Sequence, residues 1–235
     1  MTEAAESYQE AFERIEAAVE TGDTALGRLG FWRLLAKVKA DPVLAGHWAD
    51  VAGRIDRRAF EARVRLRVPV WLGNAVLLLG TLVAAFAIGV ALGTDSEVVA
   101  GLALLAAGGV CSVTLHDLAH WVTGRTVGIR FTCYFIGGPF PPRPGLKTDY
   151  ATYLKTSPAA RAWMHASGAL ATKLAPFAVL AFWPATVAPW WAAAGLLGLG
   201  VLQIVTDVLF SVKSSDWKKV RRELGVARQH ASAAR

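Results

Sequence analysis

Apolar and charged positions form long alternating blocks along this chain. Four apolar stretches cover residues 70–92, 98–123, 163–182 and 190–212, and each is close to the ~20 residues that cross a bilayer as a helix. Most charged residues lie before the first stretch, between the second and third, and after the last. The pattern predicts an all-α polytopic membrane protein with about four transmembrane helices.

Residues 1–67 have the pattern of a soluble helical region. Apolar side chains recur there at the spacings of three and four that indicate an amphipathic helix: Tyr8, Phe12, Ile15 and Val19. Glycine and aspartate at 22–23 end this helix, and a second helix is predicted over 24–39. Asp41 and Pro42 end the second, and a third helix then leads towards the first apolar stretch.

The polar segment 125–161 is predicted to be partly β. Residues 129–136 are rich in β-branched and aromatic side chains, and the run stops at the Gly-Gly-Pro of residues 137–139. Pro141, Pro142 and Pro144 are expected to exclude regular structure beyond that point. We therefore predict a short membrane-associated strand or hairpin followed by a loop.

The distribution of positive charge indicates which partners the protein binds. The formal net charge is +7, but lysine and arginine flank the apolar stretches, and the short loops 94–97 and 184–189 contain none. The positive-inside rule then predicts a multi-pass cell-membrane protein with both termini cytoplasmic, bound to lipid and not to nucleic acid. The predicted domains are an N-terminal region (1–67), a transmembrane domain (68–213) and a basic tail (214–235).

Ionisable side chains inside the apolar stretches are the candidates for chemistry, because an aspartate at mid-bilayer costs about 2.5–3.5 kcal/mol on insertion scales. His116 and His120 are four residues apart, which places both on one helix face within reach of one zinc ion. Asp117 occupies the position of the general base in the H-E-x-x-H motif. The alternative is a pair of buried, hydrogen-bonded histidines.

Asp207 is the expected third ligand. It lies about 9 Å from Lys213 along a helix, and the two histidines lie about 8–13 Å from Arg125, if each residue rises 1.5 Å. Both basic residues are predicted on the cytoplasmic side, so the three candidate ligands fall at similar depth. The alternative is that Asp207 pairs with Lys173 or caps a helix.

Several stretches in one order resemble the site-2 protease family of intramembrane zinc metalloproteases. Residues 116–120 (HDLAH) are similar to the family's metal-binding motif, and residues 124–130 (GRTVGIR) to the small-basic-x-x-Gly-Val stretch after it. Residues 157–163 (SPAARAW) resemble the family's Ser-Pro-x-x-Arg-Ala stretch, and residues 166–172 (ASGALAT) its Ala-Gly-Pro-Leu-Ala-Asn stretch. Asp207 stands where the family's Asp-Gly ligand motif is expected.

The resemblance implies an enzyme that hydrolyses peptide bonds of membrane-embedded protein substrates. Zn²⁺ would be held by His116, His120 and Asp207, and Asp117 would take a proton from the water that zinc activates and pass it to the leaving amine. Thr172 would steady the tetrahedral intermediate near the substrate carbonyl. The strand predicted at 129–139 would pair with an unwound substrate.

This chain departs from the family pattern at several positions. Asp117 replaces glutamate and is one methylene shorter, Thr172 replaces asparagine, and Val208 replaces the glycine after the ligand aspartate. Lys173 is outside the family pattern and is expected either to pair with an aspartate or to stabilise an oxyanion. His165, at the start of the third stretch, is expected to be an interfacial polar residue. The shorter Asp117 keeps open a catalytically inactive relative that acts as a binding or scaffolding module.

Overall fold

The computed structural model describes residues 3–137, 143–209 and 215–233. The chain forms two compact units, and each is assembled from separate parts of the sequence. The first unit contains Met1–Val70, Gly124–Arg161 and Glu223–Arg235. The second unit contains Trp71–Thr123 and Ala162–Arg222.

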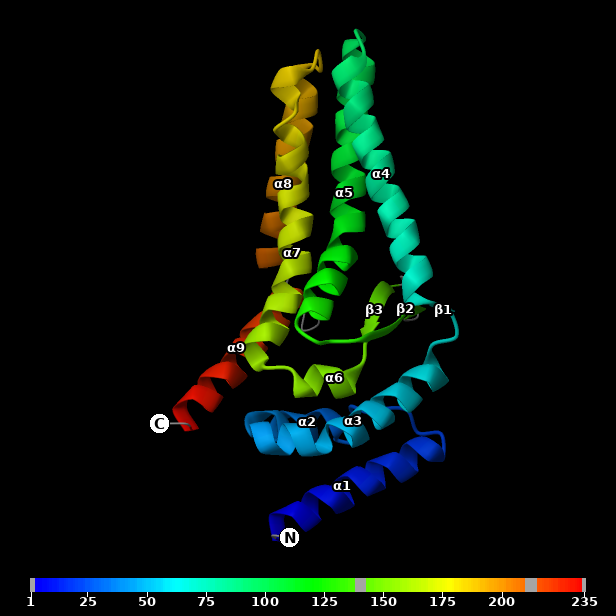
Figure 1. Cartoon of the computed structure of the whole chain (residues 1–235), viewed down its shortest axis with the longest axis vertical. Coiled ribbons are helices and arrows are strands. Elements are labelled where there is room, and N and C mark those ends of the chain that lie inside the picture. Colours follow the sequence, from blue (N-terminus) through cyan, green and yellow to red (C-terminus); the bar gives the residue numbers. More distant parts are fainter. Residues whose placement is uncertain (1–2, 138–142, 210–214, 234–235) are drawn as a thin grey trace. The chain divides into compact units, whose positions relative to one another are not determined.

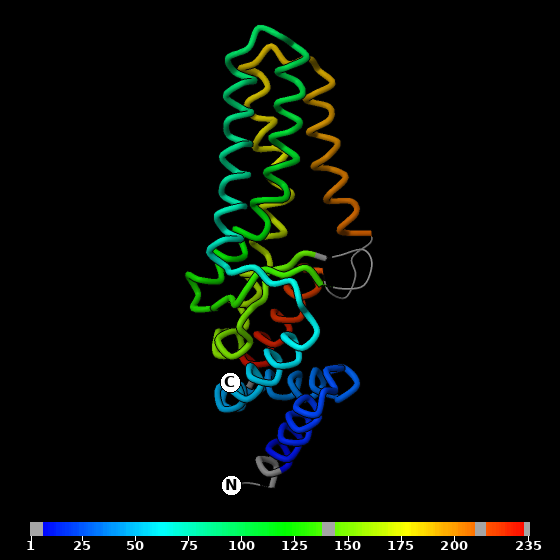
Figure 2. Tube along the Cα trace, turned by 90° about the vertical axis from the view of Figure 1, so that its right-hand side faces the viewer, coloured from blue at the N-terminus to red at the C-terminus, as the bar shows by residue number. Residues whose placement is uncertain are grey.

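The second unit is built on helices long and apolar enough to cross a membrane, which confirms the predicted polytopic helical fold. These are α4 (Val70–Gly93), α5 (Glu97–Thr126), α7 (Pro158–Leu180) and α8 (Trp190–Leu209), with a short 3-10 turn η1 (Trp183–Ala185) before α8. The helix α9 (Asp216–Ala233) begins in this unit, and from Glu223 onwards it belongs to the first. Figure 1 shows α4, α5, α7 and α8 as long neighbouring rods, and Figure 2 shows the same four from the side.

Small residues let these helices approach closely. A Cβ atom at Gly108 of α5 would lie 2.4 Å from the Cδ2 atom of Leu196 of α8, so a larger residue there would force the Leu196 side chain to shift. The hydroxyls of Thr81 in α4 and Thr114 in α5 are 3.0 Å apart and hydrogen-bond across the helix pair. Close packing and an interhelical hydrogen bond replace the hydrophobic driving force that lipid does not supply.

The first unit contains the N-terminal helices α1 (Glu3–Glu20), α2 (Phe31–Ala40) and α3 (Pro42–Arg63), together with α6 (Tyr150–Lys155). Apolar faces of these helices meet in a core that includes Phe12, Phe31, Leu35 and Ile55. The second helix begins later than predicted, because residues 26–30 form turns and Gly30 has a left-handed φ of 78° before α2. Gly30 precedes the first residue of α2, and Asp41 and Pro42 lie at the start of α3, where glycine, aspartate and proline are common helix-boundary residues.

Three antiparallel strands complete the first unit: β1 (Arg67–Val68), β2 (Phe131–Gly137) and β3 (Arg143–Thr148), in the order β1-β2-β3. The predicted strand is therefore β2, and it is the central one. The expectation that Pro144 excludes regular structure is wrong, since this residue lies in β3 opposite Ile136. An edge strand accepts proline, because an imino nitrogen that faces away from the partner strand costs no ladder hydrogen bond. Pro141 and Pro142 lie outside the described residues.

Residues 124–161, which fall within the predicted transmembrane domain of 68–213, cluster with the N-terminal helices in the first unit. β2 pairs with β1, so Phe135 lies opposite Arg67, and α6 packs so tightly on α3 that a Cβ atom at Gly53 would lie 2.7 Å from the Cβ atom of Ala151. The residues of the predicted tail, 214–235, divide between the two units: Asp216–Arg222 belong to the second unit, and the residues from Glu223 onwards to the first.

Candidate metal centre

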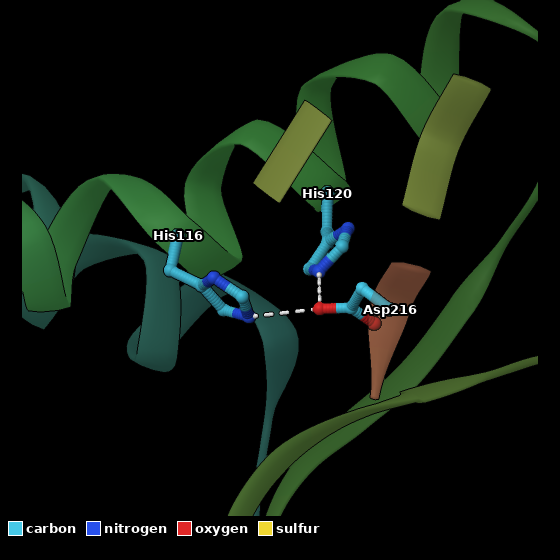
Figure 3. Close-up of side chains that lie close together, drawn as sticks. All are labelled: His116, His120 and Asp216. Atoms are coloured by element: carbon cyan, nitrogen blue, oxygen red, sulfur yellow. Dashed lines mark hydrogen bonds and ion pairs between the residues drawn. The ribbon is translucent and has the colours of Figure 1, made fainter. Parts of the chain in front are cut away.

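Three potential metal ligands converge in the second unit. His116 and His120 project from the same face of α5, and Asp216 is the first residue of α9 (Figure 3). One nitrogen of each imidazole and one carboxylate oxygen lie within 4.8 Å of one another. The Oδ2 atom of Asp216 is 3.5 Å from Nε2 of His116 and 3.2 Å from Nε2 of His120.

Helix α7 orients both imidazole rings through their other nitrogen atoms. Nδ1 of His120 lies 2.7 Å from the carbonyl oxygen of Met164, and Nδ1 of His116 lies 3.1 Å from the carbonyl oxygen of Gly168 and 2.8 Å from the hydroxyl of Thr172. A carbonyl oxygen only accepts, so each Nδ1 carries a proton and each Nε2 is the ring nitrogen that faces Asp216. Histidine ligands of metal ions are held in this way.

The chemistry of this donor set fits a metal ion. The two imidazole Nε2 atoms and a carboxylate oxygen point at one another, an arrangement that can hold a cation between them. Burial raises the pKa of Asp216, but the hydrogen bond with His120 and the charge of Lys219 outweigh that effect and hold the pKa well below its ordinary value of 3.8. The carboxylate is therefore ionised at neutral pH and available to a cation.

Asp207, the predicted third ligand, lies outside this cluster. Its Oδ2 atom is 2.7 Å from Nζ of Lys173, so the alternative in which these two residues pair describes the structure. Asp216 takes the expected place of Asp207 among the ligands. Asp207 lies within the last apolar stretch, at a depth similar to that of the histidines. Asp216 lies beyond the last stretch, and its signal was the Ser-Asp pair that starts a helix.

The other predicted site residues lie around this centre in different ways. The hydroxyl of Thr172 donates to the carbonyl of Gly168 (3.1 Å) and contacts His116, so it holds a ligand, and its role at an oxyanion stays a prediction. Lys173 pairs with Asp207. Asp117 is half-buried next to His116 on α5, and its carboxylate makes no hydrogen bond or ion pair with the described part of the chain.

His165 is a site residue that sequence reasoning missed. It lies on α7, is only 9% exposed, and its Nδ1 atom is 3.8 Å from Oδ1 of Asp216. Its ring centre is 6.2 Å from that of His120. A lone histidine near the start of an apolar stretch carries no local signal for this contact, because the partner is Asp216 on a distant helix.

The fold and the cluster together define a polytopic membrane protein with a candidate metal centre on α5 and α9. Comparisons with protein-family models, with curated proteins and with solved structures give no match. The function therefore has to be inferred from the residues of the site.

Proposed function

We propose that this protein is an intramembrane zinc metalloprotease similar to the site-2 protease family. The observation that carries the proposal is the convergence of His116, His120 and Asp216, with both imidazoles held through Nδ1 by α7. Two nitrogens and one oxygen form a three-ligand set of the kind that catalytic zinc sites use, with one position left for water. The positions of lysine and arginine support a cell-membrane protein with both termini in the cytoplasm.

Each residue then has a chemical task in peptide hydrolysis. Zinc, when bound, supplies Lewis acidity that lowers the pKa of water towards 7. Asp117 accepts the proton of the attacking water and passes it to the leaving amine as general base and then general acid. Thr172 keeps the His116 ring oriented. The charge of Lys173 is neutralised by Asp207, which argues against a role of Lys173 in stabilising an oxyanion.

The substrate in this proposal is a membrane-embedded protein segment in an extended form, because a helix shields its peptide bonds. The strand at 129–139 was expected to receive it, but β2 is paired on both sides. An added strand would have to use the outer edge of β3 (Arg143–Thr148), which pairs with no other strand in the described residues.

The test is the metal content of the detergent-purified protein. We expect about one zinc per chain in the wild type, a loss of zinc in His120→Ala and Asp216→Ala, and full zinc in His47→Ala, which removes an exposed histidine of the first unit. Asp207→Ala is expected to keep its zinc. Zinc that is absent from the wild type, or that survives both ligand substitutions, would exclude the proposed centre.

A catalytically inactive relative is the second candidate, and the shorter carboxylate of Asp117 favours it. A displacement of about 1 Å in a catalytic group can cost on the order of 10²-fold in rate. In a working protease, Asp117→Asn abolishes cleavage of a membrane-embedded reporter while zinc stays bound. In an inactive binding or scaffolding protein, neither the zinc-loaded wild type nor Asp117→Asn cleaves the reporter. Asp117→Glu is then the variant in which cleavage would appear.

A further inference from the structure

The carboxylate of Asp216 divides its two oxygen atoms between two sets of partners. Oδ2 faces the Nε2 atoms of His116 and His120 at 3.5 and 3.2 Å. Oδ1 accepts a hydrogen bond from Nζ of Lys219 at 2.9 Å and lies 3.8 Å from Nδ1 of His165. One oxygen therefore belongs to the ligand cluster, and the other to a pair of nitrogen groups outside it.

The two groups at Oδ1 come from different helices. Lys219 lies three residues after Asp216 on α9, where the helix places both side chains on one face. His165 lies on α7, and its side chain is mostly buried. Because the contacts come from two directions, rotation of the carboxylate that would bring Oδ1 towards the histidines breaks a charge-assisted hydrogen bond.

We propose that Lys219 and His165 are positioning residues that make Asp216 a one-oxygen metal ligand. This inference rests on the proposed metal binding. A carboxylate that uses both oxygens would occupy two positions around the ion, whereas a one-oxygen carboxylate and two imidazoles occupy three. The fourth position of a tetrahedral site then stays open for water, as a hydrolytic centre requires.

His165 acts on Asp216 and not on the metal itself. The nitrogen and oxygen atoms that meet within 4.8 Å belong to His116, His120 and Asp216, and His165 lies outside that group. If His165 were a ligand, four protein groups would close the site, and no position would remain for water. The distinction between positioning residue and fourth ligand can be measured.

The experiment loads full-length, detergent-purified protein with Co²⁺ in place of zinc and records its visible spectrum, because four-coordinate Co²⁺ absorbs severalfold more strongly than five- or six-coordinate Co²⁺. We expect an intense four-coordinate spectrum for the wild type and Lys219→Arg, which keeps a donor for Oδ1. Lys219→Met is expected to weaken the absorption severalfold as Asp216 becomes a two-oxygen ligand. Lys218→Met, which removes the adjacent exposed lysine, is the matched control.

The outcomes separate this inference from the proposed function. A wild type that binds neither Co²⁺ nor zinc overturns the metal centre. A wild type that binds Co²⁺, with a Lys219→Met spectrum identical to its own, overturns only the role of Lys219. His165→Ala is expected to weaken the absorption while both imidazole ligands remain in the X-ray absorption of the zinc-loaded protein; loss of one imidazole would make His165 a direct ligand. The His165 variant also decides the inference if Lys219→Met does not fold.

Discussion

Gly168 of α7 lies so close to the ring of His120 in α5 that a Cβ atom at residue 168 would be 2.3 Å from Nε2 of the imidazole. The same Cβ atom would be 2.5 Å from both Cδ2 and Cε1 of the ring. The imidazole cannot move away without loss, because its Nδ1 atom is held by the carbonyl of Met164 at 2.7 Å. The absence of a side chain at residue 168 therefore makes room for the imidazole of His120 in the candidate metal centre.

Replacing Gly168 by alanine is expected to displace His120 and to lower the zinc affinity on the order of 100-fold, because ligand orientation is lost. Competitive titration against a zinc chelator measures this change. Gly109→Ala is the control, since a Cβ atom at this glycine of α5 meets nothing within 4 Å. Wild-type affinity in Gly168→Ala would show that the ring can bind metal from another position.

The parts of this molecule that sequence alone predicts are those that depend on nearby residues. The four spans follow from the length and apolarity of each stretch. The histidine pair follows from a spacing of four on one helix, and His116 and His120 do lie together in the structure. In each case the relevant interaction lies within one helix or between one helix and the lipid.

The parts that sequence reasoning missed depend on contacts between distant segments. Asp216 and Asp207 carry the same functional group, and only the packing of α9 and α8 decides which one meets the histidines. His165 approaches Asp216 from a separate helix in the same way. The sequence predicted β2 but not β1, because β1 is two residues long and pairs with a strand more than sixty residues away.

The ion pair between Lys173 and Asp207 predicts an asymmetric response to substitution. Removing one partner leaves a partly buried charge without compensation, so Lys173→Met is expected to destabilise the protein, by less than the about 3–5 kcal/mol typical of a fully buried pair. Lys173→Met combined with Asp207→Asn is expected to recover most of that loss, because no charge remains. Thermal unfolding in detergent measures both variants.

The matched control for this ion pair is Lys155→Met, which removes the exposed pair with Asp50 and is expected to cost less than about 1 kcal/mol. A double variant no more stable than Lys173→Met would show that the lysine contributes something other than charge compensation.

Thr172 can be tested for its two possible roles by comparing valine and serine. Valine removes the hydroxyl that contacts Nδ1 of His116 at 2.8 Å, whereas serine keeps it. If the hydroxyl holds the ligand, Thr172→Val lowers zinc affinity by about 10-fold and Thr172→Ser does not. If it serves an oxyanion instead, Thr172→Val leaves zinc affinity unchanged and lowers only the rate of cleavage. The zinc titration therefore decides between the roles without a substrate.

The first unit contains a buried carboxylate whose charge is expected to control its stability. Glu223 of α9 is 0% exposed, and its oxygens lie 2.6 Å from Nζ of Lys39, 2.7 Å from Nε of Arg161 and 3.0 Å from the hydroxyl of Tyr153. Glu223→Gln leaves two buried cations without their counter-ion. We expect this variant to lose about 3–5 kcal/mol of stability at neutral pH.

The pH dependence of that loss has a definite sign. Burial raises the pKa of Glu223, but the charges of Lys39 and Arg161 outweigh it and hold the pKa below the ordinary value of 4.5. The unfolded chain therefore takes up the proton first, so this stabilisation is fully present above about pH 4.5 and is lost as the pH falls through the lower pKa of the folded state. Hydrogen exchange of peptides from α2 and α6, compared between wild type and Glu223→Gln, should differ strongly at pH 7 and converge as the pH falls below 4.5. A difference that stays constant across this range would mean that the shape of the glutamate side chain, and not its charge, holds these helices together.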